Sequence, residues 1–124
     1  MISRFVVHRH KTGRSHFDLR FVEADILRCW SLLKEPPVRN GEKRLAIERE
    51  SFAARDMNRP LFTEEAFGTG SVVAWDEGEI EIVATSSRSF HLSFRGVRLS
   101  GDYELRRMRW YPGNRWLLQK TGGI

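Results

Sequence analysis

FVVHRHKTGRSHFDLRF, residues Phe5 to Phe21, alternates apolar and polar side chains on either side of a short turn. Successive side chains of an extended strand point to opposite faces, so the strand that begins at His16 has one apolar face and one polar face. Residues 2–8, before the turn, predict a second strand, which carries His8 and His10 on one side. Pairing of the two strands as a hairpin would bring His10 back beside His16.

The polar face gathers residue types that suit a metal ion with a phosphate beside it. His10, His16 and Asp18 supply two imidazoles and a carboxylate. This donor set suits Mn, Fe, Co or Zn and leaves coordination positions open for water and substrate. Arg20 follows two residues later and could hold a phosphate oxygen with its planar guanidinium. A lone His-x-Asp pair on a strand is usually a solvated polar face, and the third ligand, His10, is what favours a metal site.

Length and composition limit the class of protein. The 124 residues leave room for one domain, residues 1–124, and 40% hydrophobic residues can fill its core. The net charge of +5 suggests a polyanionic partner, although alone it is weak evidence. Cys29 is the only cysteine, so an internal disulfide is excluded and a reducing cytoplasm is the expected compartment. No apolar run approaches the roughly 20 residues of a membrane span, so no membrane association is expected.

The rest of the chain is typical of short antiparallel strands. Alternating patterns occur at 26–33, 43–50, 90–94, 97–105 and 115–120, and the strongest hairpin pattern lies at 70–83, around an Asp-Glu-Gly turn. Residues 51–60 lack alternation and predict a loop or a helical turn. About eight short strands predict an all-β fold, and a compact antiparallel β-barrel is favoured over a sandwich because closure removes the sheet edges.

The run HKTGRSHFDLR, His10 to Arg20, resembles the signature of the 3'-phosphoesterase domain of bacterial DNA ligase D and of its stand-alone bacterial and archaeal relatives. The two histidines, the aspartate and the arginine have the same spacing. Further matches follow in order: SLLKEP (31–36), EKRLAIE (42–48), GTGSVVAWDEG (68–78), RGVRLSGDYEL (95–105) and RWLLQK (115–120). The resemblance therefore extends from Phe5 to Lys120.

The resemblance implies a compact β-barrel with its active site in a surface groove. It also implies Mn as the preferred metal, with Zn or Co as alternatives, and cleaning of DNA 3' ends before ligation in non-homologous end joining. A DNA ligase or a Ku-type end-binding protein would be a partner. His10, His16 and Asp18 would hold the metal.

The resemblance also assigns roles to basic and acidic residues that spacing alone does not distinguish from ordinary surface charges. Lys34 and Arg44 match a lysine and an arginine that act at the phosphate together with Arg20, and Glu50 matches an acidic active-site residue. Two cations of the hairpin turn, Lys11 and Arg14, could follow the DNA strand that leads to the end.

The chain departs from the family pattern at two active-site positions. In gap-free register, Phe52 stands where the family has a histidine and Asp56 where it has a tyrosine. Phenylalanine cannot exchange a proton or bind phosphate, so the departures favour a phosphodiesterase over a 3'-monoesterase. His8 and His91 could substitute by residue type alone. The departures leave open a catalytically weak or inactive module that binds DNA ends for a ligase-based repair system, and a barrel with a merely polar face is a third interpretation.

Overall fold

The computed structural model describes residues 1–11, 15–55, 72–109 and 113–123. These residues contain nine β-strands: β1 (Ile2–His10), β2 (His16–Glu23), β3 (Ile26–Leu32), β4 (Lys43–Glu48), β5 (Phe52–Ala53), β6 (Val72–Thr85), β7 (Ser89–Arg95), β8 (Ser100–Arg107) and β9 (Arg115–Gly122). The predicted all-β class is confirmed. The predicted strand at residues 26–33 ends one residue early, and part of the predicted loop at residues 51–60 forms β5.

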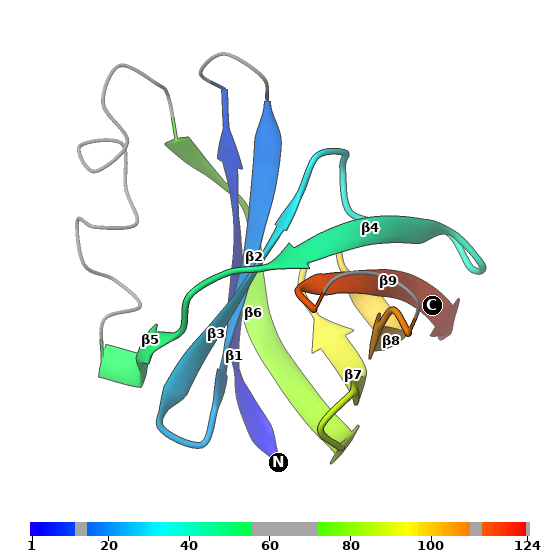
Figure 1. Ribbon diagram of the computed structural model, residues 1–124. Coiled ribbons are helices and arrows are strands. Elements are labelled where there is room, and N and C mark those ends of the chain that lie inside the picture. Colours follow the sequence, from blue (N-terminus) through cyan, green and yellow to red (C-terminus); the bar gives the residue numbers. More distant parts are fainter. Residues whose placement is uncertain (12–14, 56–71, 110–112, 124) are drawn as a thin grey trace.

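The strands form one antiparallel sheet that closes on itself (Figure 1). Around the ring the order is β1, β6, β7, β8, β9, β4, β3 and β2, and β2 pairs back with β1. Closure pairs both edges of each of these strands, which leaves no free edge in the ring. The short β5 lies outside the ring and pairs with β3, where Phe52 is opposite Leu27. The predicted compact antiparallel barrel is therefore confirmed.

Aromatic and aliphatic side chains fill the barrel interior. The apolar face of β2 points inward, and Leu19 and Phe21 are at most 1% exposed. Trp30 stacks on Phe21 with ring centroids 5.2 Å apart, and Trp75 is buried in the same core. Full burial of such a side chain contributes about 1.5–3 kcal/mol relative to exposure. This packing fixes the strands, and so it fixes the positions of the polar side chains on their outer faces.

A smaller apolar cluster lies on the outside of the barrel, across β1, β2 and β3. Val6, Leu27 and Cys29 are buried there, and Phe52 packs against them. The strand register places Val6 and Cys29 opposite Arg20, so this outer cluster flanks the arginine. Burial raises the pKa of the Cys29 thiol to about 11. The thiol is therefore protonated at neutral pH, as expected for a buried packing residue.

The hairpin predicted within residues 70–83 is wrong. This part of the chain runs through the single strand β6, which pairs with β1 on one side and β7 on the other. Asp76 does not turn the chain, because its buried carboxylate accepts hydrogen bonds from the N–H groups of residues 97–99 and holds the turn between β7 and β8. A Cβ atom at Gly78 would lie 2.6 Å from a carbonyl oxygen of β7. The Asp-Glu-Gly pattern therefore reflects close packing between strands.

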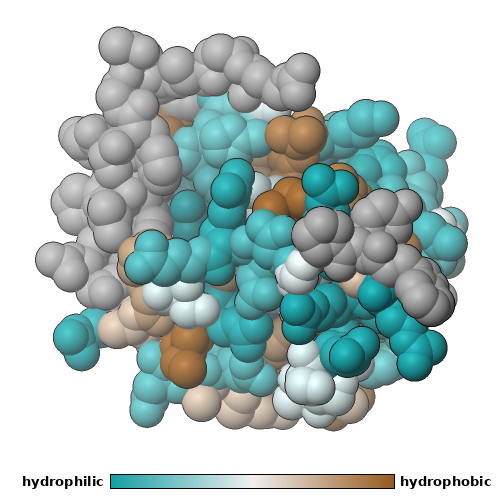
Figure 2. Space-filling model, viewed as in Figure 1, coloured by the Kyte–Doolittle hydropathy of each residue, from teal (hydrophilic) through white to brown (hydrophobic). Residues whose placement is uncertain are grey.

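The outer surface of the barrel is mostly polar. Figure 2 shows hydrophilic side chains over most of the visible face, with small apolar areas between them. Within the described part of the chain, no helix has the length and apolar character needed to cross a membrane.

Candidate metal centre

The β1–β2 hairpin brings the predicted ligands together at one end of the two strands. His10 is the cross-strand partner of His16, and His8 is the partner of Asp18. The imidazole rings of His10 and His16 stack with centroids 4.4 Å apart and an interplanar angle of 8°. Because side chains two residues apart on a strand share a face, Asp18 lies next to His16 on the same face of β2. The expected return of His10 to His16 is confirmed.

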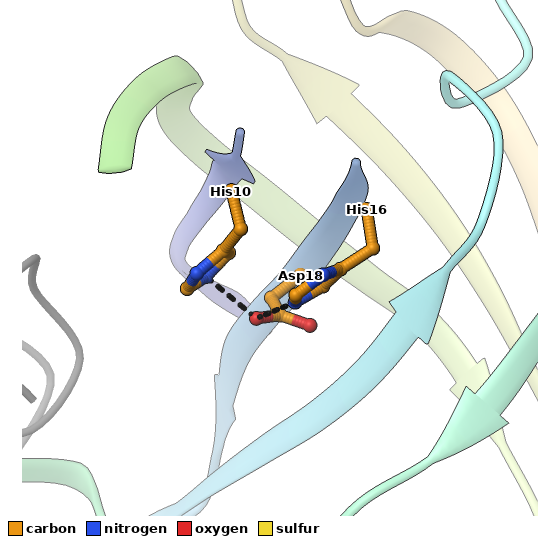
Figure 3. A group of neighbouring side chains, drawn as sticks. All are labelled: His10, His16 and Asp18. Atoms are coloured by element: carbon orange, nitrogen blue, oxygen red, sulfur yellow. Dashed lines mark ion pairs between the residues drawn. The ribbon is translucent and has the colours of Figure 1, made fainter. Parts of the chain in front are cut away.

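One carboxylate oxygen lies between the two imidazoles (Figure 3). Asp18 Oδ2 is 2.8 Å from His10 Nε2 and 3.4 Å from His16 Nε2. The potential ligand atoms of the three residues all lie within 4.8 Å of one another. His10 and Asp18 are buried, whereas the His16 side chain is 32% exposed. The triad therefore opens toward solvent on the side of His16.

Hydrogen bonds and a nearby cation keep Asp18 ionised. Burial alone would raise the pKa of this carboxyl group, but hydrogen bonds from His10 and Ser31 and the positive charge of Arg20 lower the pKa to about 2. The Ser31 hydroxyl donates to Asp18 Oδ1 at 2.6 Å, which leaves Oδ2 directed at the histidines. An ionised carboxylate next to two imidazole nitrogens fits a divalent metal of the Mn, Co or Zn kind.

Arg20 lies buried behind the triad and joins it to His8. Its Nη1 donates to His8 Nδ1 at 2.8 Å, and its Nη2 lies 3.4 Å from Asp18 Oδ2. Burial, followed by the charge of Arg20, lowers the pKa of His8 to about 4. His8 is therefore neutral at physiological pH and serves as an acceptor that orients the guanidinium.

Two residues at the triad were not predicted from the sequence: Ser31, which contacts Asp18, and Arg49, which contacts Ser31. Ser31 is the cross-strand partner of Asp18 on β3, and Arg49, which follows β4, donates from Nε to the Ser31 hydroxyl at 3.1 Å. Arg49 is exposed to solvent. The pairing of β2 with β3 and of β3 with β4 brings these side chains to the site, and the pattern within a single strand does not show which residues become cross-strand partners.

Lys34 and Arg44 line a neighbouring groove of about 260 Å³, together with Leu33, Lys43, Leu45 and Ile47. Ile47 is the cross-strand partner of Ser31, so the groove begins beside the triad. Arg44 directs its guanidinium elsewhere: Nε donates to the Glu35 carbonyl at 2.7 Å, and Nη2 lies 3.4 Å from Glu42 Oε2. Lys34 is exposed. Among the described residues, neither cation contacts the triad.

None of the other predicted site residues that the structure describes contacts the triad. Glu50 and Lys11 are exposed, and no contact between either residue and the triad is present in the described part of the chain. Arg14 and Asp56 lie outside the described residues. His91 is on the far strand β7, where it pairs with Glu104 at 3.6 Å, so it is not at the triad.

Comparison with known proteins identifies the family. The family model described as the DNA Ligase D 3'-phosphoesterase domain matches residues 8–107. The multifunctional non-homologous end joining protein LigD of Mycobacterium bovis is 27% identical over 126 residues, which cover 94% of this chain and 16% of that protein. The protein of the same name from Pseudomonas aeruginosa is 30% identical over 111 residues, which cover 82% of this chain and 13% of that protein.

The chain thus spans only 13–16% of the length of the curated relatives it matches. The matched region includes the triad, Arg20, Ser31 and Arg49. The resemblance predicted from the His10–Arg20 signature is confirmed, and the chain belongs to the DNA ligase D 3'-phosphoesterase domain family.

Proposed function

We propose that the chain is a metal-dependent phosphoesterase that removes a 3'-phosphate or a 3'-ribonucleotide from DNA ends before repair ligation. The observation that carries this proposal is the convergence of His10, His16 and Asp18 within 4.8 Å at a partly open position. The family match supports the reaction class and a role in DNA repair. Mn is the proposed metal, with Zn or Co as alternatives that the same donors accept.

The residues around the metal would each have a distinct role. His10, His16 and Asp18 would hold the ion, which when bound supplies a Lewis acid for the phosphate and an activated water. Ser31 fixes Asp18 from one side and Arg20 from the other. The positive charge of Arg20 would also neutralise charge that develops on the phosphate.

Further cations could hold the rest of the substrate. Arg49 is an exposed cation that donates a hydrogen bond to Ser31, which in turn donates to Asp18, so we propose that Arg49 contacts the phosphate from the solvent side. Lys34 and Arg44 line the adjoining groove and would contact phosphates further along the strand. We retain Glu50, Lys11 and Arg14 as proposed contributors: Glu50 as an acidic group of the active site, and the two cations as contacts to the DNA strand.

The basic test is turnover on a primer-template with a 3'-phosphate and on one with a 3'-ribonucleotide. We expect product with Mn and none after chelation by EDTA, because the proposed reaction depends on the ion. Turnover that persists in EDTA would contradict the metal-dependent mechanism.

Replacing Ser31 with alanine is expected to weaken Mn binding by about 10- to 100-fold, the usual effect of losing a residue that orients a ligand. Ser31→Ala removes the 2.6 Å hydrogen bond that holds Asp18 Oδ1 but no proposed metal ligand. Isothermal titration calorimetry measures the change, with Ser93→Ala on the distant strand β7 as the matched control. Unchanged affinity in Ser31→Ala would show that the aspartate does not need this bond.

One observation favours the second candidate function, a module that binds DNA ends with little or no turnover. Phe52 packs against the outer apolar cluster of Val6, Leu27 and Cys29, and this cluster flanks Arg20. An apolar side chain there stabilises the barrel but offers no proton or hydrogen bond to a phosphate. Binding of a 3'-phosphate end without turnover in Mn would support this candidate.

The double substitution Phe52→His with Asp56→Tyr is expected to raise 3'-monoesterase activity by at least about tenfold, since a positioned acid or base typically contributes 10²–10⁴-fold. The monophosphate carries more negative charge than a diester near neutral pH, so it gains most from the added donor. Rates on 3'-phosphate and 3'-ribonucleotide ends are compared with Mn present, and Phe52→Leu serves as the apolar control. A wild type that is already fast on the monophosphate, with no gain in the double variant, would show that another group has taken over the role.

A further inference from the structure

A second basic surface lies on the opposite side of the barrel from the metal centre. It is a groove of about 970 Å³ lined by Arg88, Ser89, Arg106, Arg107, Met108, Arg109 and Leu117. In the closed ring, β8 is the fourth strand from β2 in both directions, through β1, β6 and β7 or through β3, β4 and β9. The groove is therefore separate from the metal centre, and it adjoins the smaller groove at the β4–β9 pair, where Leu117 is the cross-strand partner of Leu45.

The strand register builds the floor of this groove. Arg106 on β8 is the cross-strand partner of Ser89 on β7 and of Leu117 on β9, so the three side chains form one row on the outer face. Backbone hydrogen bonds hold the ends of the groove, because the Met108 N–H donates to the β9 carbonyl of Arg115 at 2.8 Å. Leu117 and Met108 are only partly buried and give the groove an apolar floor between its arginines.

The arginines of this groove are largely without acidic partners. Arg106 forms an ion pair with Glu104 at 2.9 Å, but within the described part of the chain Arg88, Arg107 and Arg109 form no ion pair. Some arginines elsewhere on the surface are paired: Arg95, for example, lies within 4 Å of two glutamates. Figure 2 shows hydrophilic side chains on the side of the molecule where Figure 1 places β8 and β9. Several uncompensated positive charges around an apolar floor are complementary to a chain of phosphates that also has flat, apolar faces.

We propose that this groove binds single-stranded nucleic acid, with phosphates on the arginines and bases over Met108 and Leu117. Guanidinium groups bind phosphate oxygens through their planar fork and also stack on bases, so an arginine-lined groove suits both parts of a nucleotide. The inference rests on the proposed function for its choice of DNA as the polyanion. A recessed 3' end at the metal centre would leave the template continuing as a single strand, which could reach this side.

Size and stiffness favour a single strand over a duplex in this position. A compact domain of this length is about 35 Å across, which is close to ten base pairs of duplex. Duplex DNA has a persistence length of about 150 base pairs, so a duplex end held at the metal centre cannot bend around the barrel to the far groove. A flexible single strand can.

The test measures the affinity for an oligothymidylate of about 12 nucleotides, within the usual site size for single-strand binders, by fluorescence anisotropy in EDTA over a range of salt concentrations. The groove variant is Arg88→Gln with Arg109→Gln, whose exposed side chains can be changed without disturbing the core. The control variant, Arg39→Gln with Arg95→Gln, removes the same charge from exposed positions outside both sites. We expect the groove variant to bind about tenfold more weakly and its salt slope to fall by roughly 1.4, or 0.7 for each lost phosphate contact.

An equal loss of oligothymidylate affinity in the groove and control variants would overturn the proposal. Binding would then depend on the net positive charge of the protein and not on the groove. Displacement of the oligonucleotide by polyglutamate at equal or lower concentration would also overturn it, in favour of an acidic protein partner. Turnover on a short blunt 3'-phosphate duplex keeps the two proposals apart: the groove variant is expected to retain it. If no variant turns over but single-strand binding still depends on the groove, the proposed activity fails and this inference stands.

Discussion

Substitution of His16 with alanine is expected to lower Mn affinity by at least about 100-fold, more than the 10- to 100-fold typical of losing an outer partner, and to abolish phosphoesterase turnover. His16 contributes one of three clustered ligand atoms, and its Nε2 lies 3.4 Å from Asp18 Oδ2. Its side chain is 32% exposed, so its removal creates little cavity and the barrel should remain folded. Calorimetry measures the affinity, a 3'-phosphate primer-template measures the rate, and thermal unfolding measures the stability.

His91→Ala is the matched control, because this histidine is exposed, lies on β7 away from the triad and pairs with a single carboxylate. The control should keep both Mn affinity and turnover. His10→Ala is a poorer test, because His10 is only 2% exposed and its loss also disturbs packing. Equal Mn affinity in His16→Ala and wild type would remove His16 from the ligand set and leave His10 and Asp18 as an ordinary buried ion pair.

The fold could be predicted from the sequence wherever the alternation of a strand reflects only which of its own side chains point into the core. In β2 the period of two separates inward Phe17, Leu19 and Phe21 from the polar face, and no alternative register buries them. The pattern in β6 misled because Asp76 and Gly78 are typical turn residues. There the aspartate caps a turn that belongs to other strands, and the glycine admits a neighbouring backbone. Both roles are set by tertiary packing, so the local sequence around these two residues does not reveal them.

The cluster of three candidate metal ligands was predictable because all three residues lie in one hairpin, where the spacing fixes their faces. Ser31 reaches Asp18 through the β2–β3 pairing, and Arg49 reaches Ser31 beside the β3–β4 pairing, so both depend on a register between neighbouring strands that the pattern within one strand does not fix. Arg44 illustrates the same limit. Its guanidinium donates to the Glu35 carbonyl at 2.7 Å and lies 3.4 Å from Glu42 Oε2, and the strand pattern does not show that these groups draw it away from the triad.

Arg20→Lys is expected to reduce turnover by at least about 100-fold and nearly as much as Arg20→Ala, because lysine keeps the charge but lacks the planar fork. The guanidinium donates to His8 Nδ1 at 2.8 Å while it lies 3.4 Å from Asp18 Oδ2, and a single ammonium cannot reproduce both contacts. Arg20→Ala should also lower the free energy of unfolding by about 3 kcal/mol, as expected when one partner of a buried pair is removed. Rates on the 3'-phosphate primer-template and chemical denaturation measure the two effects.

Arg28→Lys is the matched control. It shows how much stability is lost when any arginine that bridges two side chains is replaced with lysine, apart from the role of Arg20 in the site. Arg28 also joins two side chains, Glu23 and Glu48, each at 2.9 Å, but it stacks on Trp30 within the barrel and does not contact the triad. This control should lose stability and keep its rate. Mn affinity then distinguishes two roles for Arg20: affinity retained with turnover lost indicates direct action on the phosphate, whereas loss of both indicates that Arg20 acts by holding Asp18. A lysine variant with a near wild-type rate would contradict both roles and reduce Arg20 to a diffuse positive charge.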